Sequence, residues 1–286
     1  MCAFVLDLDG QLLRFVAIYT DITKQKHAER KLLQINKDLT DSIDYASQIQ
    51  KALLPKVYML TLLAPESFIF YQPRDVVSGD FPWFKRINNT LVLAAVDCTG
   101  HGVPGALMSM ISHEMLNQVI SHSDIQAPGD ALAMLDQRII TALHQEREDA
   151  SHQDGLDIAL AVIHDDNRLQ FAGARRPLLL VRNREIIEIK PEKISVGGRD
   201  DHKKNFVTQE MQLEKGDRVY LFSDGYNDQF GGPKNKKYLM KRFKELLISM
   251  VELSMVEQES VIHNTFYDWK GDNMQVDDVL VMGVEI

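Results

Sequence analysis

Apolar residues run without interruption over residues 91–96 and stop at Asp97, where a glycine-rich turn begins. An apolar run of this length, bounded by turn residues, is typical of a buried strand. Gly100 and Gly102 allow the chain to turn tightly, and Pro104 stands where a helix tolerates proline, in its first turn. The pattern therefore predicts a buried strand that delivers Asp97 at its end, followed by a helix over 103–121. A carboxylate in that position is costly unless it is paired or bound to a cation.

Elsewhere in residues 55–286, strand-like segments come in clusters separated by short turns, and helical segments come in pairs. This order lacks the regular alternation of strand and helix that a doubly wound sheet requires. It favours an α+β fold in which antiparallel sheets carry helices on their outer faces. The predicted strands cover residues 68–71, 91–96, 156–164, 169–172, 177–182, 186–190, 205–213, 218–222 and 279–286, and the other predicted helices cover 129–148, 236–253 and 256–269.

The first 54 residues have a different pattern. Residues 1–22 predict a hairpin with a turn at Asp9-Gly10, and residues 23–54 predict one long helix that ends before Pro55. Within this helix a heptad spacing of seam positions places Leu32, Ile35, Leu39, Ser42, Ala46, Ile49 and Leu53 on one stripe.

Two interpretations of this stripe are open. The first is a coiled coil, in which residues 28–54 form a parallel homodimer that carries a signal into the next domain. The second is an amphipathic helix that packs on its own domain. Ser42 and Ala46 weaken the coiled-coil seam, and the second half of the helix is suited to both roles.

Composition narrows the classes of function. The chain has 286 residues with 45% hydrophobic content, enough for one large domain and an appendage. Its formal net charge of −9 argues against a nucleic-acid-binding protein. No apolar run approaches the ~18 residues of a membrane span, and there is no signal-peptide pattern. Cys2 and Cys98 form no disulfide or metal-binding motif, which is typical of a protein from the reducing cytoplasm.

Four segments place an aspartate at a turn beside a predicted strand. They contain Asp80, Asp97, Asp224 and the pair Asp277-Asp278. Carboxylate oxygens without histidine or thiolate partners select Mg²⁺ or Mn²⁺ rather than Zn²⁺. Several carboxylates in one pocket repel one another unless cations neutralise them. Two divalent ions ~3.5–4 Å apart can activate the water between them, and that water is the obvious nucleophile for a phosphoryl group.

These segments also carry a family resemblance. In chain order, VSGDFPWF, DCTGHGVPGALMS, DGLDIALAVI, FAGARRPLLLVR, LEKGDRVYLFSDGYNDQFGG and QVDDVLVMGVEI resemble the metal-dependent serine/threonine protein phosphatases of type 2C. Within that class, residues 43–286 are similar to the bacterial SpoIIE-like subclass. The resemblance implies a double β-sandwich flanked by helices, in α-β-β-α layers, with two Mn²⁺ or Mg²⁺ ions at one end.

The resemblance also implies an activity and a set of site residues. It implies hydrolysis of phosphoserine or phosphothreonine on a regulatory protein, such as a STAS-type anti-sigma-factor antagonist, by a water that the two metals activate. Asp97 would bridge the two ions, and no residue would act as a covalent nucleophile. The implied ligands are Asp80, Asp97, the backbone carbonyl of Cys98, Asp224 and Asp277, with Asp278 as the alternative to Asp277.

Other residues near these motifs have two interpretations each. His101 is either a proton donor to the leaving serine oxygen or a structural histidine bonded to the turn. The arginine that grips phosphate in the eukaryotic branch has no clear match. Arg74, Arg175 and Arg176 are candidates, and each is otherwise an exposed or salt-bridged arginine.

The N-terminal region resembles another family over about 25 residues. The segment from Asp9-Gly10 through FVAIYTDITKQKHAE resembles the last two strands of a PAS sensor domain and the exit into its signalling helix. This implies a sensor upstream of residue 1, whereas the alternative is a hairpin that belongs to the catalytic domain itself. We expect residues 43–54 to pack near the helix at 103–121 and thereby to control the Asp97 turn.

Two other functions remain open at this point. A non-catalytic signalling module of the same fold would bind a partner, although such a module usually lacks some of the aspartates. A hydrolase of small phosphoesters would keep the site but not the protein substrate.

Overall fold

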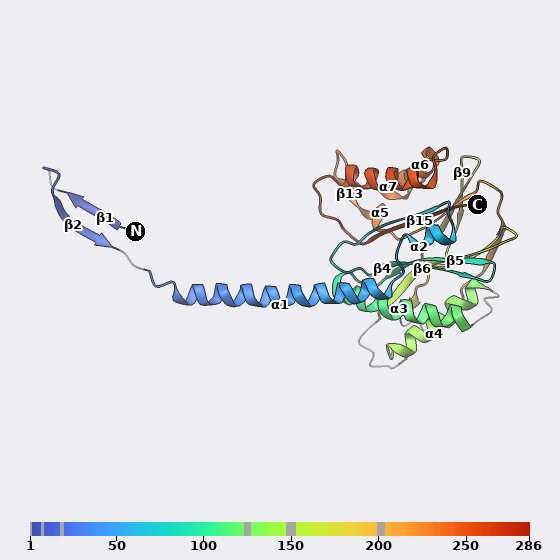
Figure 1. Ribbon diagram of the computed structural model, residues 1–286, viewed down its shortest axis with the longest axis horizontal. Helices are drawn as coiled ribbons and strands as arrows, with labels where there is room; N and C mark the ends of the chain where they lie inside the picture. The colour runs from blue at the N-terminus through green and yellow to red at the C-terminus, as the bar shows by residue number, and fades with distance from the viewer. Residues whose placement is uncertain (1, 7–8, 18–19, 123–126, 147–152, 199–203) are drawn as a thin grey trace. The chain divides into compact units, whose positions relative to one another are not determined.

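The computed structural model describes residues 2–6, 9–17, 20–122, 127–146, 153–198 and 204–286 (Figure 1). The chain divides into two compact units, Met1–Tyr45 and Ala46–Ile286. The division falls inside the long helix predicted over 23–54. Within the described part of the chain, no helix combines the length and the apolar character needed to cross a bilayer.

The first unit contains the predicted hairpin and most of the predicted helix. Strands β1 (Cys2–Leu6) and β2 (Leu12–Ala17) pair antiparallel around the Asp9-Gly10 turn, where Gly10 has a φ of 80°. Residues 7–8 and 18–19 of the predicted hairpin lie outside the described residues. Helix α1 (Thr23–Leu53) exposes more than half of Leu32, Ile35 and Leu39. The relation of this hairpin to a PAS domain stays a prediction.

The second unit is built on two antiparallel sheets. The first has the strand order β11-β7-β6-β5-β4, with β10 paired to β6, and the second has the order β3-β15-β12-β8-β9. The strands of the first sheet are β4 (Asp80–Ile87), β5 (Thr90–Cys98), β6 (Gly155–His164), β7 (Arg168–Ala174), β10 (Val196–Gly197) and β11 (Gln209–Gln212). Those of the second are β3 (Ser67–Gln72), β8 (Leu178–Arg182), β9 (Glu185–Ile189), β12 (Arg218–Phe222) and β15 (Val279–Glu285).

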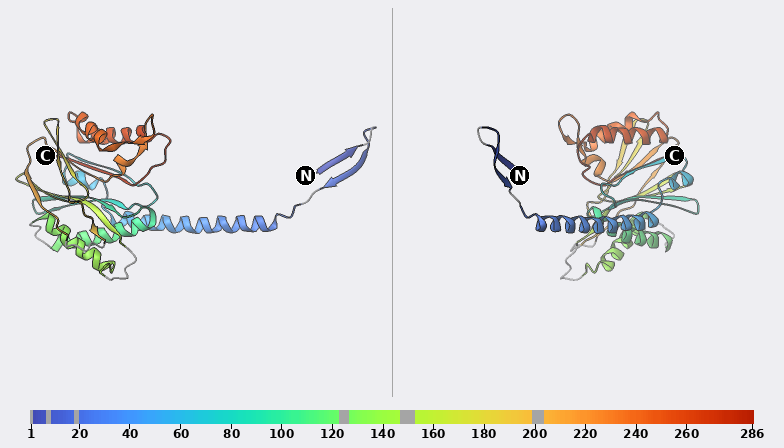
Figure 2. Two further views of the ribbon diagram at one scale, coloured as in Figure 1. Left: turned by 180° about the vertical axis from the view of Figure 1, so that it is seen from behind. Right: turned by 60° about the vertical axis from the view of Figure 1, so that its left-hand side comes forward.

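Helices cover the outer faces of both sheets. Helices α3 (Gly102–His122) and α4 (Pro128–Ala142) pack on the first sheet, whereas α6 (Leu239–Ser249) and α7 (Met255–Lys270) pack on the second. Figure 2 shows the two helix layers on opposite sides of the paired sheets. The predicted α+β sandwich with α-β-β-α layers is therefore confirmed.

Strand β5 shows why the run at 91–96 is apolar throughout. Leu93 and Ala95 face the other sheet, and Val92 and Ala94 face the helices α3 and α4. Because both faces of the strand are buried, neither face needs polar side chains. The same alternation places the Asp97 side chain on the face between the two sheets.

Some elements differ from their predicted extent. The segment beginning at Asp80 was expected as a turn, but it forms the edge strand β4, where Pro82 is tolerated because an edge strand does not need every N–H. The helix predicted over 236–253 starts only at Leu239, because β14 (Lys236–Lys237) pairs with β13 (Phe230–Gly231). The helix predicted over 129–148 ends at Ala142, and positions 147–148 lie outside the described residues. Two short helices, α2 (Met59–Leu63) and α5 (Gly225–Asp228), were not predicted.

Candidate functional site

Three aspartates stand side by side at one end of the first sheet. Asp80 on β4 pairs in register with Asp97 on β5, and Asp97 pairs with Asp157 on β6. All three occupy positions whose side chains face the second sheet, since each keeps the alternation of that face. The sheet therefore presents a row of carboxylates at the end of the sandwich.

The second sheet brings further aspartates to the same end. Asp224 lies two residues after the end of β12, and Asp277 lies two residues before the start of β15. These two strands are antiparallel neighbours, so the end of one lies beside the start of the other. The charges of Asp224 and Asp277 both raise the pKa of Asp97, so these carboxylates lie near those of the first sheet.

Arg176 joins the two sheets at this point. It lies on the connection from β7 in the first sheet to β8 in the second. Its Nη2 atom is 2.8 Å from Asp97 Oδ2 and 2.6 Å from Asp224 Oδ2. Burial alone would lower the pKa of this guanidinium, but the neighbouring carboxylates raise it well above its ordinary value. Arg176 is therefore a permanent cation inside the carboxylate group.

Burial and mutual repulsion raise the pKa of four carboxyl groups in this site, those of Asp80, Asp97, Asp157 and Asp277. Burial raises the pKa of Asp97 to about 7, although Arg176 opposes the shift. The pKa of Asp80 is raised well above its usual range, first by burial and then by the Asp97 charge. Burial also raises the pKa of Asp157 and of Asp277. A group of this kind favours any cation that enters it.

Asp277 and Asp278 have different surroundings. Asp278 is 1% exposed, and its two carboxylate oxygens accept hydrogen bonds from the backbone N–H groups of Arg74 and Gly79, both at 2.7 Å. The oxygens of Asp278 thus hold the turn before Asp80. Asp277 accepts one hydrogen bond on Oδ1, from the N–H of Asp278 at 2.9 Å, which leaves it better placed as a ligand.

Cys98 contributes no side chain to the carboxylate row. Its Sγ is buried beneath α3, 3.7 Å from the Ser112 hydroxyl, and burial raises the pKa of the thiol. The carbonyl oxygen of Cys98 lies close to the turn that precedes Asp80. A Cβ built on Gly79 in that turn would be 3.3 Å from this oxygen. The cysteine is therefore accommodated in this site because its side chain points to the helix layer.

His101 and two of the candidate arginines lie at the margin of the site. The His101 Nδ1 is 3.3 Å from Asp75 Oδ2, and both side chains are nearly half exposed. Arg74 donates from Nη1 to the carbonyl of Val276, and the exposed Arg175 reaches within 3.9 Å of one oxygen of Asp157. Of the three arginines considered from the sequence, only Arg176 lies within the carboxylate group.

The residues of this group have the donor chemistry of a magnesium or manganese site. All the side-chain donors are carboxylate oxygens. Asp80 is 3% exposed, and its Oδ2 is buried without a hydrogen-bond partner among the described residues, which is costly unless a cation meets it. As the described side chains stand, no three acidic, histidine or cysteine residues are grouped closely enough to hold a metal ion. The guanidinium of Arg176, in contact with both Asp97 and Asp224, takes the place between them.

Sequence reasoning missed three residues of this region. Asp157 lies in the motif DGLDIALAVI, and its position at the start of an apolar strand is the signal that could have identified it. Gln50 on α1 is buried and donates to the carbonyl of Ser78 at 2.6 Å and to the hydroxyl of Ser109 at 2.8 Å. Ser195 donates to Asp157 Oδ1 at 2.6 Å, and no local pattern marked it.

We call α1, the long helix predicted over residues 23–54, the linker helix. The hydrogen bond between Gln50 and Ser109 also tests whether its last turns pack beside the helix predicted over 103–121, as expected. Ser109 belongs to α3, so the end of α1 packs beside the helix predicted over 103–121. This part of the expectation is confirmed.

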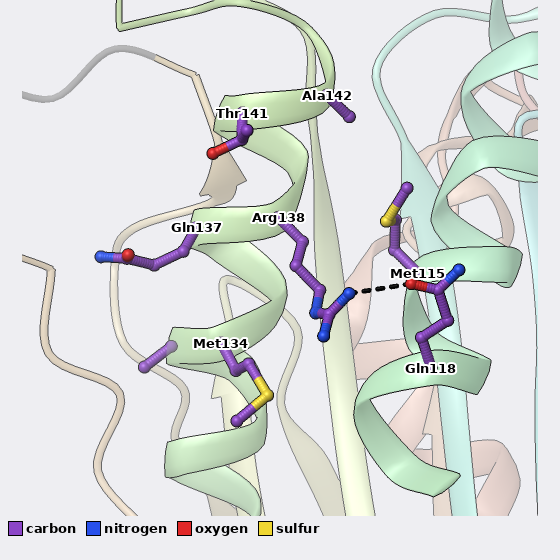
Figure 3. A pocket seen from close by; sticks show the side chains of 8 residues that line it. Met115, Gln118, Met134, Gln137, Arg138, Thr141 and Ala142 are labelled. Atoms are coloured by element: carbon purple, nitrogen blue, oxygen red, sulfur yellow. Dashed lines mark hydrogen bonds between the residues drawn. The ribbon is translucent and has the colours of Figure 1, made fainter. Parts of the chain in front are cut away.

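A separate cavity of about 740 Å³ lies between α3 and α4 (Figure 3). Arg138 on α4 donates to Gln118 on α3 across it, at 2.8 Å. Met115 and Met134 supply much of its apolar wall. The lining contains no carboxylate, imidazole or thiol, so the cavity is not part of the carboxylate site.

Comparison with known proteins agrees with this architecture. The family model described as Stage II sporulation protein E (SpoIIE) matches residues 88–286. The SiaA-PP2C domain of Pseudomonas aeruginosa is 30% identical, with a TM-score of 0.80 over 88% of this chain and 98% of that one. No curated protein sequence gives a match.

Two more distant structures share the fold. The phosphatase domain with a regulatory fragment of SpoIIE from Bacillus subtilis is 16% identical, with a TM-score of 0.62 over 77% of this chain and 63% of that one. The RsbU and RsbW domains of a Mycobacterium tuberculosis protein are 19% identical, with a TM-score of 0.60 over 78% and 60%. Since the family model covers most of the second unit, this chain belongs to the SpoIIE family of PP2C-type phosphatase domains.

Proposed function

We propose that this protein is a metal-dependent phosphatase that hydrolyses phosphoserine or phosphothreonine on a regulatory protein. The observation that carries the proposal is the convergence of carboxylates from both sheets at one end of the sandwich. A group of like charges is costly without a cation when, among the residues that the structure describes, one oxygen of the buried Asp80 has no hydrogen-bond partner. It is explained by a cationic cofactor, Mn²⁺ or Mg²⁺, in a protein of this family.

Each side chain has a proposed role in this chemistry. Asp97 lies at the centre of the row, and the carboxylates of Asp80, Asp97, Asp224 and Asp277 would hold the cations. The Cys98 carbonyl would complete the oxygen ligands. When bound, the cations supply a water of lowered pKa and positive charge toward the phosphoryl oxygens. The sandwich end keeps these donors in place, because β4, β5, β12 and β15, which carry them or lie next to them, begin or end there.

His101 is the proposed proton donor to the leaving serine oxygen. Its Nδ1 faces Asp75 at 3.3 Å, a pairing that would orient the ring and leave Nε2 for the substrate. Its exposure at the edge of the site suits a group that meets a protein substrate. The pairing with Asp75 serves a purely structural histidine equally well, so the role needs its own test: His101→Gln should lower the rate most for substrates with poor leaving groups.

The metal-dependent hydrolysis is tested with p-nitrophenyl phosphate and with a phosphoserine protein, in Mn²⁺, in Mg²⁺ and in EDTA. Asp224→Ala should abolish activity in either metal. Asp228→Ala is the matched control, because Asp228 lies one helical turn further on and pairs with Lys237 at 2.7 Å. Activity that survives both EDTA and Asp224→Ala would contradict the proposed function.

The same assay separates the other two functions. A small-phosphoester hydrolase would cleave p-nitrophenyl phosphate but not the phosphoprotein. A non-catalytic module would cleave neither and would still bind the phosphoprotein. A STAS-type anti-sigma-factor antagonist is the first protein substrate to try, because the family resemblance suggests that class.

We also propose that the linker helix controls the site. The support is the Gln50 side chain, which is bonded to the backbone of Ser78 at both its carbonyl and its N–H, two residues before Asp80. A rotation or withdrawal of the helix would remove these bonds and loosen the turn that positions Asp80. An upstream sensor would act through this contact.

The homodimer through residues 28–54 is proposed on the same helix. The domain-facing stripe contains Ser47, Gln50 and Leu54, and it differs from the heptad seam. Ile49 and Leu53 on the seam remain exposed. A second copy of the helix could therefore pair along the seam without displacing the contacts to the domain.

A further inference from the structure

The Arg176 guanidinium contacts three carboxylates through a single nitrogen. Besides Asp97 and Asp224, its Nη2 is 3.3 Å from Asp157 Oδ2. Its Nε is buried and has no hydrogen-bond partner among the described residues. The guanidinium is thus held by the ion pairs of its Nη2 atom and is not fixed by a full set of hydrogen bonds.

The backbone that carries Arg176 is tightly constrained. The N–H of Arg175 donates to the carbonyl of Glu192 at 2.8 Å, and the N–H of Arg176 donates to the carbonyl of Ala174 at 2.7 Å. A Cβ added to Gly173 would lie only 2.5 Å from the Arg176 carbonyl oxygen. Because the backbone cannot withdraw, the guanidinium can leave Asp97 and Asp224 only by rotation of its side chain.

Asp157 is placed to receive the rotated guanidinium. Its Oδ1 is held by the Ser195 hydroxyl at 2.6 Å, which leaves Oδ2 facing Arg176. Ser195 is fixed in turn, since its carbonyl accepts from Lys204 Nζ at 3.0 Å and Lys204 is paired with Asp136 at 2.8 Å. These contacts keep Asp157 at the edge of the site whether or not the other carboxylates move.

We propose that Arg176 is an internal counter-ion that competes with divalent cations for Asp97 and Asp224, and that Asp157 retains its guanidinium when a cation binds. This deepens the proposed function and rests on it. A cation that binds the Oδ2 atoms of Asp97 and Asp224 must displace Nη2 from both, so Arg176 lowers the metal affinity. Arg176 and Asp157 are positioning residues that act through the metal ligands.

The test is the affinity for Mn²⁺, measured by calorimetry on the metal-free chain. Arg176→Gln removes the competing charge and should lower the Mn²⁺ dissociation constant by at least about tenfold, as expected for one unit charge beside the site. Arg176→Lys keeps the charge and should bind closer to the wild type. Arg175→Gln is the matched control, since Arg175 is exposed and contacts only the edge of Asp157.

A double-mutant cycle tests the part assigned to Asp157. Asp157→Asn should weaken Mn²⁺ binding, and the weakening should be at least about threefold larger in the wild type than in the Arg176→Gln background. Equal effects in both backgrounds would show that Asp157 acts only as a nearby charge, and the retention role would be wrong.

The proposed competition between Arg176 and the cation is wrong if the Arg176→Gln variant binds Mn²⁺ no more tightly than the wild type. A purely structural arginine would give that outcome, because its loss would loosen the ligands. If the metal-free variant does not fold, the same constant is obtained by EDTA titration of Mn²⁺-loaded protein. A wild type that binds no Mn²⁺ would instead contradict the proposed function itself.

Discussion

Gln50 offers the sharpest test of how the linker helix supports the site. Its amide is buried between α1 and the core, with three hydrogen bonds: Nε2 to the Ser78 carbonyl at 2.6 Å, Nε2 to the Ser109 hydroxyl at 2.8 Å, and the Ser78 N–H to Oε1 at 3.1 Å. Gln50→Met keeps the length and approximate volume of the side chain but removes all three bonds. The substitution therefore isolates the polar contact from the packing.

The cost follows from which groups lose their partners. The Ser78 carbonyl keeps the Ser109 hydroxyl at 3.2 Å, and that hydroxyl also keeps the Ala106 carbonyl at 2.9 Å. The buried Ser78 N–H is left without a hydrogen-bond partner, which costs about 1–3 kcal/mol. The loss of the two hydrogen bonds that Gln50 Nε2 donates costs about 0.5–1.5 kcal/mol each. Burial of the methionine side chain offsets part of this, so we expect a loss of about 3 kcal/mol. For a unit of this size that lowers Tm by roughly 6–12 °C.

The assay combines thermal unfolding in EDTA with the Mn²⁺ dependence of phosphatase activity. Gln50→Met should lower Tm by the amount above and raise the Mn²⁺ concentration that gives half-maximal activity, because the turn before Asp80 is loosened. Gln48→Met is the matched control: the same substitution on the same helix at an exposed position. If the two variants have the same Tm and the same Mn²⁺ dependence, the linker helix does not support the site through Gln50.

Three further predictions concern pH, packing and assembly. The fold holds the pKa of Asp97 at about 7 through burial, against about 4 in the unfolded chain, so its contribution to stability is complete below about pH 4 and is lost as the pH rises through 7. The Tm of the metal-free protein should fall over that range, and a Tm that rises there would contradict the assignment. Gly225→Ala places a Cβ 2.0 Å from the Asp278 carbonyl oxygen and should cost about 3 kcal/mol in urea unfolding; a loss below about 1 kcal/mol would show that the contact can relax. Leu39→Asp places a charge in the exposed heptad stripe and should turn a dimer into a monomer by sedimentation, whereas an unchanged mass would rule out that seam.

The sequence predicted the layers and most of the strands because their signal is local. The alternation of apolar and polar residues and the turn residues are enough to place β5, β6 and β12 to within one or two positions. Strand β4 was missed because Pro82 and the charged residues after it argue against a central strand, and only its edge position makes them tolerable. Edge position is a property of the sheet and not of the segment.

The candidate site shows the same contrast between what local sequence predicts and what depends on the whole sheet. The aspartates beside turns were visible in the sequence, but Asp157 gained its place from strand register, which no local pattern determines. The difference between Asp277 and Asp278 depends on the backbone N–H groups of Arg74 and Gly79, about 200 positions earlier in the chain. Contacts of this range could not be derived from spacing.

The turn before Asp80 connects these observations. Two adjacent backbone N–H groups are held by different elements: that of Ser78 by Gln50 on the linker helix, and that of Gly79 by Asp278, just before β15. Asp97, by contrast, is fixed by its place inside β5, with strands paired on both sides. Movement of the linker helix would therefore disturb Asp80 and leave Asp97 in place. In the two-cation site proposed above, a phosphatase regulated through this helix would first lose the cation held by Asp80, so Gln50→Met should weaken one Mn²⁺ site while the other keeps its affinity.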